Sequence, residues 1–261
     1  MKEDLKMKIF ATSDVHSFYD ELMIALSNAG FDINNEEHIF VSCGDLLDRG
    51  PFAKKCLEFV NSLPANRKIL IRGNHELLAI SMIRKGYYGQ HDWWNGTADT
   101  AQQLCEYPDP YCVTEEEVIE SFSRNPDWIK YYNSTVYYKE IGDYIFTHAW
   151  IPYAKNEDLD TKEYTEDWRN LSFHDCIWDN GMDLWSKGIK EPSKTIVCGH
   201  FHAMWGHKNL HNEFDSNYPT NHNCRPFEDE GIIALDSMVP ASRFLNVKVI
   251  EVPDEIFKEW F

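Results

Sequence analysis

The feature that most constrains this chain is a repeated pairing of an apolar run with residues that ligate metals. Five apolar runs, each suited in length to a buried strand, end shortly before aspartate, asparagine or histidine. The residues that follow them are Asp14 and His16, Asp45, Asn74, His148, and His200 with His202. Open α/β sheets bind ligands at the carboxyl ends of their strands. One histidine after a strand is commonly structural, but five such endings predict a shared site.

The order of the expected elements indicates an α/β fold. Apolar runs at 8–13, 38–43 and 68–71 predict strands, and helical patterns follow them at 18–29, 53–63 and 77–85. Three strand–loop–helix units in succession are typical of an α/β core. Further strands are expected at 135–139 and 144–147, as a hairpin, and at 195–198, 232–235 and 244–252.

Two stretches depart from this alternation, at 87–133 and 151–194. Both are polar and rich in aromatic residues, and we interpret them as insertions within a single domain spanning 1–261. Thr114 and Glu117 have the spacing of a capping box, which predicts a helix start in the first insertion. Core packing is the default for six tryptophans in or beside these regions, with a substrate groove as the alternative. They are Trp93, Trp94, Trp168, Trp178, Trp185 and Trp205.

Composition excludes several classes of partner. The 261 residues carry a formal net charge of −18, which argues against nucleic acid and anionic membranes as partners. An anionic substrate is not excluded, because a local cluster of cations can dominate its own pocket. The seven cysteines are odd in number and include no C-x-x-C pair, which argues against a disulfide framework and a thiolate zinc site. The N-terminus lacks the apolar core of a signal peptide. With no apolar run near the roughly 20 residues of a membrane span, we expect a cytoplasmic protein.

The ligand set predicts a pair of metal ions. Carboxylates, imidazoles and one amide oxygen, with no thiolate, suit Mn²⁺ first and also Fe or Zn²⁺. The ligands are numerous enough for two divalent ions. Asp45 is the natural bridge, because one carboxylate offers an oxygen to each ion. Asp45 also belongs to a stretch, 44–50, that places Asp48 and Arg49 beside it between two glycines.

These motifs together resemble the calcineurin-like metallophosphoesterase superfamily. The residues concerned are Asp14-x-His16, Gly44-Asp45-x-x-Asp48-Arg49-Gly50, Gly73-Asn74-His75-Glu76, His148 and Gly199-His200-x-His202. Asp48-Arg49-Gly50 and Arg72-Gly73-Asn74-His75-Glu76 are similar to the serine/threonine protein phosphatase branch, which also contains symmetrical dinucleoside tetraphosphatases. The resemblance implies a four-layer αββα fold, with two mixed sheets flanked by helices.

The resemblance also implies the metal ligands. Asp14, His16 and Asp45 would hold one ion, and the other would be held by Asp45, Asn74, His148 and His200. We include His202 as a ligand of the first ion, as in phosphodiesterase-type relatives, although protein phosphatases usually lack this second histidine. Ser17 stands where the family usually has glycine, and Ala149-Trp150 stands where glycines often follow the histidine. These departures affect the substrate prediction more than the predicted chemistry.

The implied chemistry is direct attack on phosphorus by a hydroxide that bridges the metals. His75 would protonate the leaving oxygen, with Asp48 orienting its ring and favouring the imidazolium form. Arg49 would bind phosphate oxygens, because a planar guanidinium contacts two of them at once. Arg72 either assists or forms a structural ion pair. The family has a further phosphate-binding arginine, for which Arg169 is the candidate as the only arginine between His148 and His200.

Three functions remain open on this sequence. The first is a phosphate monoesterase similar to serine/threonine protein phosphatases, acting on a phosphoprotein or a small phosphate ester. The second is a hydrolase of dinucleoside polyphosphates or phosphodiesters, which His202 favours. The third is a binding protein on a degenerate phosphatase fold. Degenerate members would be expected to lose ligands or the Asp48 and His75 pair, and this chain retains all of them.

Overall fold

The computed structural model describes residues 6–107, 113–156, 159, 161–213, 222–253 and 255–256. Two five-stranded mixed sheets form the centre of the molecule. The first sheet has the order β12 (Lys248–Pro253), β1 (Lys6–Thr12), β2 (His38–Ser42), β3 (Lys68–Ile71) and β4 (Thr135–Val136). The second has the order β10 (Phe227–Asp229), β11 (Ile232–Ala234), β9 (Thr195–Cys198), β6 (Tyr144–Thr147) and β5 (Tyr138–Ile141).

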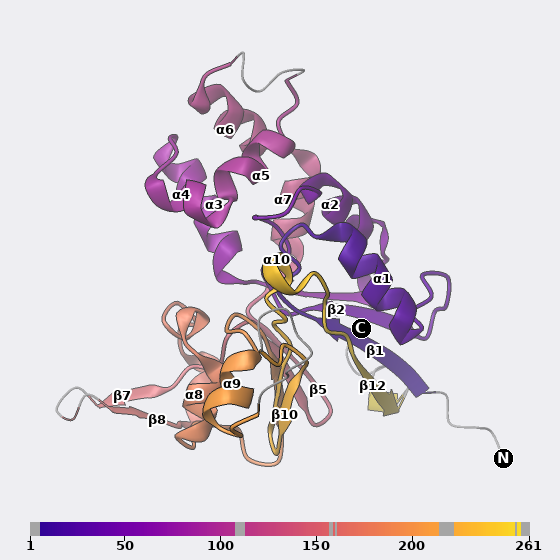
Figure 1. Ribbon diagram of the computed structural model, residues 1–261, viewed down its shortest axis with the longest axis vertical. Helices are drawn as coiled ribbons and strands as arrows, with labels where there is room; N and C mark the ends of the chain where they lie inside the picture. The colour runs from indigo at the N-terminus through magenta and orange to yellow at the C-terminus, as the bar shows by residue number, and fades with distance from the viewer. Residues whose placement is uncertain are drawn as a thin grey trace.

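Helices cover the outer face of each sheet, which confirms the αββα architecture (Figure 1). On the first sheet they are α1 (Tyr19–Ala29), α2 (Ala53–Ser62), α3 (Asn74–Lys85), α4 (Gln90–Asn95), α5 (Thr97–Gln103), α6 (Glu115–Arg124) and α7 (Pro126–Ser134). Beside the second sheet lie α8 (Gly181–Ser186) and α9 (Met204–Asn209), and α10 (Val239–Ser242) precedes β12. Among the described residues, no helix is both long and apolar enough to cross a membrane.

Strand alternation divides the apolar residues among three cores. In β1, Ile9 packs between the two sheets, whereas its neighbour Phe10 packs against the helices of the first sheet. In β9, Val197 joins the core between the sheets, and its neighbour Ile196 joins the core under the second sheet's helices. Successive side chains of a strand point to opposite faces, so a strand buried on both sides is apolar throughout. This accounts for the continuous apolar runs in the sequence.

Parallel pairing brings the carboxyl ends of the central strands to one edge. β1, β2 and β3 are parallel neighbours in the first sheet, and β6, β9 and β11 are parallel neighbours in the second. Within these two sheets, as far as the structure describes them, the antiparallel strands are the outer strands β12, β10 and β5. The loops that leave these six central strands therefore emerge together, where the sheets lie face to face.

The single strand predicted at 135–139 is wrong. The difference lies where the chain passes from the first sheet to the second. The run 135–139 was expected to form a single strand, but it divides into β4 and β5. β4 pairs with β3 in the first sheet, and β5 pairs with β6 in the second. The hairpin of β5 and β6 around Gly142 is as predicted. The chain therefore crosses from one sheet to the other at Tyr137, which a run of strand-forming residues does not reveal.

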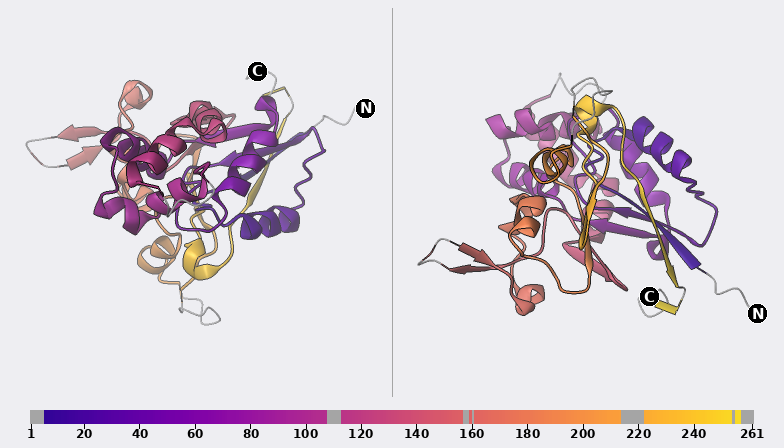
Figure 2. Two further views of the ribbon diagram at one scale, coloured as in Figure 1. Left: turned by 90° about the horizontal axis from the view of Figure 1, so that it is seen from above. Right: turned by 60° about the horizontal axis from the view of Figure 1, so that its bottom comes forward.

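The two polar stretches have different structures. The described part of 87–133 contributes α4 to α7, and Thr114 forms the predicted capping box with Glu117 at the start of α6. The stretch 151–194 contains a hairpin that the sequence pattern did not suggest, β7 (Ala154–Asn156) with β8 (Thr161–Glu163). This hairpin projects away from the two sheets (Figure 2). The last strand, expected at 244–252, begins only at Lys248.

The core between the sheets should dominate stability. Ile9 is fully buried there, so Ile9→Ala removes apolar contacts and leaves a cavity, and we expect it to lower the free energy of unfolding by about 2–5 kcal/mol. Ile24, on α1, is 61% exposed, so Ile24→Ala is a matched control with an expected change below about 0.5 kcal/mol. Urea unfolding followed by circular dichroism measures both. Equal losses in the two variants would contradict this account of the core.

Candidate metal centre

The predicted ligands gather at the shared edge of the two sheets. Asp14, Asp45 and Asn74 follow β1, β2 and β3 of the first sheet. His148 and His200 follow β6 and β9 of the second sheet. All five side chains are buried except His200, which is partly exposed. Strands from both sheets therefore contribute to a single group of polar side chains inside an apolar structure.

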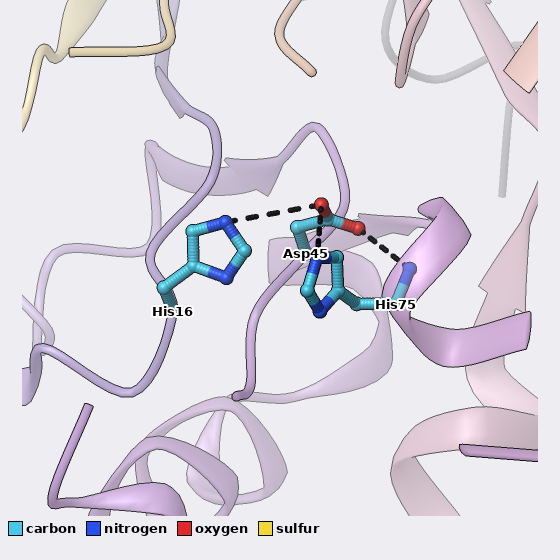
Figure 3. A group of neighbouring side chains, drawn as sticks. All are labelled: His16, Asp45 and His75. Carbon is cyan, nitrogen blue, oxygen red and sulfur yellow. Dashed lines mark hydrogen bonds and ion pairs between the residues drawn. The ribbon is translucent and has the colours of Figure 1, made fainter. Parts of the chain in front are cut away.

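Donor atoms of Asp45 and of two histidines outside this set form a first compact group, which Figure 3 shows. His16, Asp45 and His75 offer atoms that all lie within 4.8 Å of one another. Asp45 Oδ2 is 3.9 Å from His16 Nε2 and 3.8 Å from His75 Nε2. Asp45 Oδ1 accepts a hydrogen bond of 3.0 Å from the backbone N–H of His75, which holds the carboxylate in place.

A second compact group contains Asp45, His148 and His200, again within 4.8 Å. Asp45 Oδ1 lies 3.4 Å from His148 Nε2, and Asn74 Oδ1 lies 2.8 Å from the same nitrogen. Asp45 belongs to both groups, with one oxygen toward each. The arrangement fits two metal ions that share this carboxylate.

Asp14 lies close to the first compact group but is not one of its three residues. Its Oδ2 accepts hydrogen bonds from the backbone N–H of His200, at 2.9 Å, and from the Ser13 hydroxyl. Its Oδ1 is 3.9 Å from His16 Nε2. The same distance separates His16 Nε2 from Asp45 Oδ2. Asp14 therefore lies beside the first group and links it to His200.

Hydrogen bonds to Nδ1 leave the Nε2 atoms of the histidines available. Nδ1 of His16 contacts the carbonyl oxygen of Leu47 at 3.1 Å, and Nδ1 of His148 contacts that of Cys43 at 2.8 Å. A carbonyl only accepts, so each Nδ1 carries the proton and each Nε2 presents a lone pair. Outer hydrogen bonds of this kind orient the histidine ligands of metals. His148 Nε2 then faces the acceptor Asn74 Oδ1 with no proton between them, an arrangement that suits a cation.

The electrostatics of the buried groups also suit cations. Burial raises the pKa values of Asp14 and Asp45 well above their usual range, because each carboxylate is removed from water beside other carboxyl groups. Burial lowers the pKa values of His16 and His148 well below the usual value for histidine. The centre thus combines carboxylates that need positive charge with neutral imidazoles, and divalent ions satisfy both.

The backbone is strained where it delivers these side chains. Asp14, Asp45 and His200 have φ angles of +51°, +52° and +66°. Left-handed conformations of such residues cost of order 1–3 kcal/mol each and cluster at functional sites. Gly199 precedes His200, and a Cβ atom there would collide with the side chains of Ser13 and Asp14. The glycine therefore allows the loops after β1 and β9 to approach each other.

His75 and Asp48 form a buried pair beside the donor groups. Asp48 Oδ2 lies 2.7 Å from His75 Nδ1 and accepts a hydrogen bond of 2.7 Å from the Thr97 hydroxyl. Burial raises the pKa of Asp48 to about 7, against the lowering effects of hydrogen bonds with Thr100 and Thr97 and of nearby Arg49. Asp48 is therefore placed to orient the His75 ring through Nδ1. Burial first, and then Arg49, lowers the pKa of His75 well below its usual value.

Arg49 lies across the two histidines of the first group. Its guanidinium donates to His16 Nε2 at 2.9 Å and to His75 Nε2 at 3.2 Å. The residue as a whole is exposed, so an incoming substrate can reach it. Arg49 therefore supplies a cationic donor at the surface side of the buried centre.

The other two predicted arginines have different partners. Arg72 donates to Thr135 Oγ1 at 2.9 Å and lies over the Tyr132 ring, and within the described residues its side chain forms no ion pair. Arg169 donates to Glu140 and forms an ion pair of 3.0 Å with Glu191. It lines a cavity of about 1030 Å³ along β5. A phosphate would have to compete with these two carboxylates for its guanidinium.

His202 has a hydrogen bond like those of the other histidines but stays outside both compact groups. Its Nδ1 contacts Asp236 Oδ2 at 2.8 Å, which leaves Nε2 unshared by this bond. The side chain is 37% exposed, whereas Asp236 is buried. Hydrogen bonding to Asp236 raises the pKa of His202 despite the opposing effect of burial. Asp236 follows β11, and its position after a sixth strand was a signal that the sequence analysis left unused.

Glu76 is a second supporting residue that the sequence analysis did not assign. Its carboxylate accepts backbone N–H groups of Gly73, at 2.7 Å, and of Asp45 and Leu46, both at 3.2 Å. It also accepts the Tyr131 hydroxyl at 2.8 Å. Glu76 thereby connects the start of α3 to the loop after β2. The sequence feature that could have identified Glu76 is its place in the Asn74-His75-Glu76 motif.

Comparison with known proteins assigns a family to this arrangement. Residues 7–233 match the family model described as calcineurin-like phosphoesterase. The chain belongs to this family. Its members are metal-dependent hydrolases of phosphoric esters, and the strand-end residues described above are those that carried the resemblance in the sequence.

Individual relatives are more distant. A symmetrical bis(5'-nucleosyl)-tetraphosphatase of Histophilus somni is 27% identical over 195 residues, which cover 70% of this chain and 62% of that protein. The same kind of enzyme from Aromatoleum aromaticum is 32% identical over 103 residues, covering 40% of this chain and 35% of that protein. The matches thus span less than two thirds of these relatives.

A solved structure supports the fold. A crystal structure whose description proposes a diadenosine tetraphosphatase superposes with a TM-score of 0.50 and 15% identity, covering 95% of this chain and 93% of that one.

The shared carboxylate leads to a prediction for Asp45→Asn. This change keeps the shape of the side chain but removes the charge, so we expect loss of both metal ions, measured by elemental analysis of dialysed protein. We also expect Mn²⁺ to raise the melting temperature of the wild type but not of the variant. In EDTA the variant should be at least as stable as the wild type, because it no longer buries a charge.

Asp143→Asn is the matched control, because Asp143 is exposed in the turn between β5 and β6. It should bind metal and respond to Mn²⁺ as the wild type does. Full metal content in Asp45→Asn would contradict the bridging position.

Proposed function

We propose that the protein is a phosphohydrolase with two divalent metal ions, and that its substrates are dinucleoside tetraphosphates. The observation that carries the proposal is the pair of donor groups that share Asp45, one of which includes His75, with Arg49 beside it. Asp45, His16, Asn74, His148 and His200 would hold the ions, with Asp14 beside them. Mn²⁺ is the first candidate and Fe or Zn²⁺ the alternatives, because the donors are oxygens and imidazoles. Bound ions would supply Lewis acidity and make a water molecule nucleophilic at neutral pH.

Arg49 would bind and orient the phosphate. Its N–H groups point at two neutral imidazole nitrogens, which are weaker acceptors than phosphate oxygens. A phosphate that enters the centre would therefore take over these hydrogen bonds. That exchange would free Nε2 of His75 to face the substrate. Substrate binding and exposure of the proton-transfer group would thus be linked through one guanidinium.

His75 would transfer the proton to the leaving oxygen. Asp48 holds Nδ1, so the proton to be transferred occupies Nε2 when the ring is charged. The charged ring is disfavoured in the resting site, where Arg49 lies nearby. A bound phosphate would offset that positive charge, and the Asp48 carboxylate would stabilise the imidazolium. The pair would therefore gain its proton when substrate is present.

The choice of substrate depends on the relatives. The sequence alone placed phosphate monoesters first and dinucleoside polyphosphates second. The relatives from Histophilus somni and Aromatoleum aromaticum are both named as symmetrical bis(5'-nucleosyl)-tetraphosphatases, which supports the second candidate. His202, which protein phosphatases usually lack, supports the same choice. We therefore propose a nucleotide as the partner. We also propose the cytoplasm as the location, as expected from the sequence.

A substrate panel tests the proposed function. With Mn²⁺, we expect the highest kcat/KM for diadenosine tetraphosphate, with two molecules of ADP as products. Bis-p-nitrophenyl phosphate, p-nitrophenyl phosphate and a phosphoserine peptide should be poorer substrates. Preference for the peptide would instead establish the monoesterase. Absence of turnover on all four, with metals bound, would establish the binding protein.

The proton-transfer role predicts a specific pattern for His75→Asn. Turnover of a phosphoserine peptide, whose alkoxide leaving group must be protonated, should fall by about 10²–10⁴, because general acid catalysis is lost. The loss should be much smaller for p-nitrophenyl phosphate and for diadenosine tetraphosphate, because nitrophenolate and ADP leave readily as anions. Metal content should equal that of the wild type. Since His75 Nε2 belongs to the first compact group, loss of a metal ion in this variant would identify it as a ligand and refute the acid role.

A further inference from the structure

Two exposed aromatic side chains stand beside the metal centre. Trp178 is 45% exposed and Phe201 is 37% exposed, although both are large and apolar. Both rings contact the ring of His200, with centroid distances of 6.3 Å from Trp178 and 6.1 Å from Phe201. His200 is a member of the second donor group. The two rings therefore lie one side chain away from the place where a phosphate would bind.

The backbone holds these rings in position. Trp178 ends a short 3-10 helix, Cys176–Trp178, and its backbone forms a hydrogen bond with the His200 side chain. Phe201 lies between His200 and His202 in sequence, and its N–H donates to the carbonyl of Gly199 at 2.7 Å. Phe201 also packs perpendicular to Trp205, at 6.4 Å. The aromatic positions are thus tied to the same loops that deliver the metal ligands.

Packing does not account for the exposure of Trp178. Trp168, in the same stretch of the chain, is fully buried in the core of the second sheet. Trp178 instead leaves nearly half of its surface in water at the rim of a polar centre. Exposed large apolar groups beside a site mark surfaces that bind ligands. Aromatic rings there are suited to flat, uncharged ring systems, which stack on them.

We propose that Trp178 and Phe201 bind a nucleobase of the substrate by stacking. The inference rests on the proposed function, because a dinucleoside tetraphosphate whose β-phosphate occupies the metal centre has its base one phosphate and one ribose away. Charge supports a base as the occupant. The chain has a net charge of −18, so attraction for a polyphosphate has to come from the metal ions and the local guanidinium of Arg49. Stacking of an uncharged base adds affinity that the negative charge of the chain does not oppose.

The test compares two ligands that differ only by the base. Isothermal titration calorimetry with the full chain and Mn²⁺ gives the Kd of ADP and of ribose 5-diphosphate. The wild type should bind ADP about tenfold more tightly, the effect expected from one base–aromatic stack. Trp178→Ala and Phe201→Ala should each reduce this ratio toward one and leave the Kd of ribose 5-diphosphate unchanged. Trp178→Phe should retain most of the ratio.

Trp94→Ala is the matched control, since Trp94 is 69% exposed and its ring contacts His91 on its own helix. It should keep the wild-type ratio. A ratio near one in the wild type would overturn the stacking proposal, as would equal loss of both ligands in Trp178→Ala, which would mean that the ring only positions His200. This ratio does not depend on turnover. The proposed function can therefore fail in the substrate panel while stacking is confirmed, and the reverse outcome is equally distinguishable.

Discussion

The structure depends on one buried carboxylate, Asp45, which ties together the strand ends of two sheets. It follows β2 of the first sheet, yet its oxygens face His148 of the second sheet as well as His16 and His75. Glu76 holds the backbone of Asp45 in place, because its carboxylate accepts hydrogen bonds from the N–H groups of Asp45 and Gly73. Both donor groups include this residue, so the position of Asp45 decides whether one centre or two separate sites can form.

This arrangement is unfavourable for the protein without its ions. Carboxylates with raised pKa values, neutral histidines and left-handed backbone at Asp14, Asp45 and His200 all cost folding free energy. The cores on both faces of each sheet compensate for that cost. The apolar strands therefore stabilise the site, because their packing holds strained loops that would otherwise relax. Divalent ions would then bind to a centre that is already assembled.

Much of the fold and centre could be predicted from the sequence because the signals were local and repeated. A strand followed by a candidate donor residue occurs in all five predicted places, and Asp45, His148 and His200 lie together where the two sheets meet. The features that the sequence did not reveal depend on contacts between residues far apart in the chain. The division of 135–139 between two sheets follows from neighbours in space. The carboxylates that bind Arg169 come from Glu140 and Glu191, which no motif connects to it.

The supporting residues show a similar limit. Glu76 lies inside a recognised motif, yet its contacts with Asp45 and Tyr131 join three elements and are visible only in the folded chain. Likewise, Trp168 and Trp178 belong to the same polar stretch, and only packing distinguishes the buried ring from the exposed one. Sequence patterns thus identify the donors, whereas the residues that orient them require the structure.

The central claim is that Asp45 joins two metal ions into one centre, and electron paramagnetic resonance of the Mn²⁺-loaded protein tests it most directly. With two Mn²⁺ per chain, a shared carboxylate should give the spectrum of a magnetically coupled pair. The spectrum of isolated Mn²⁺ ions at the same occupancy would contradict the claim.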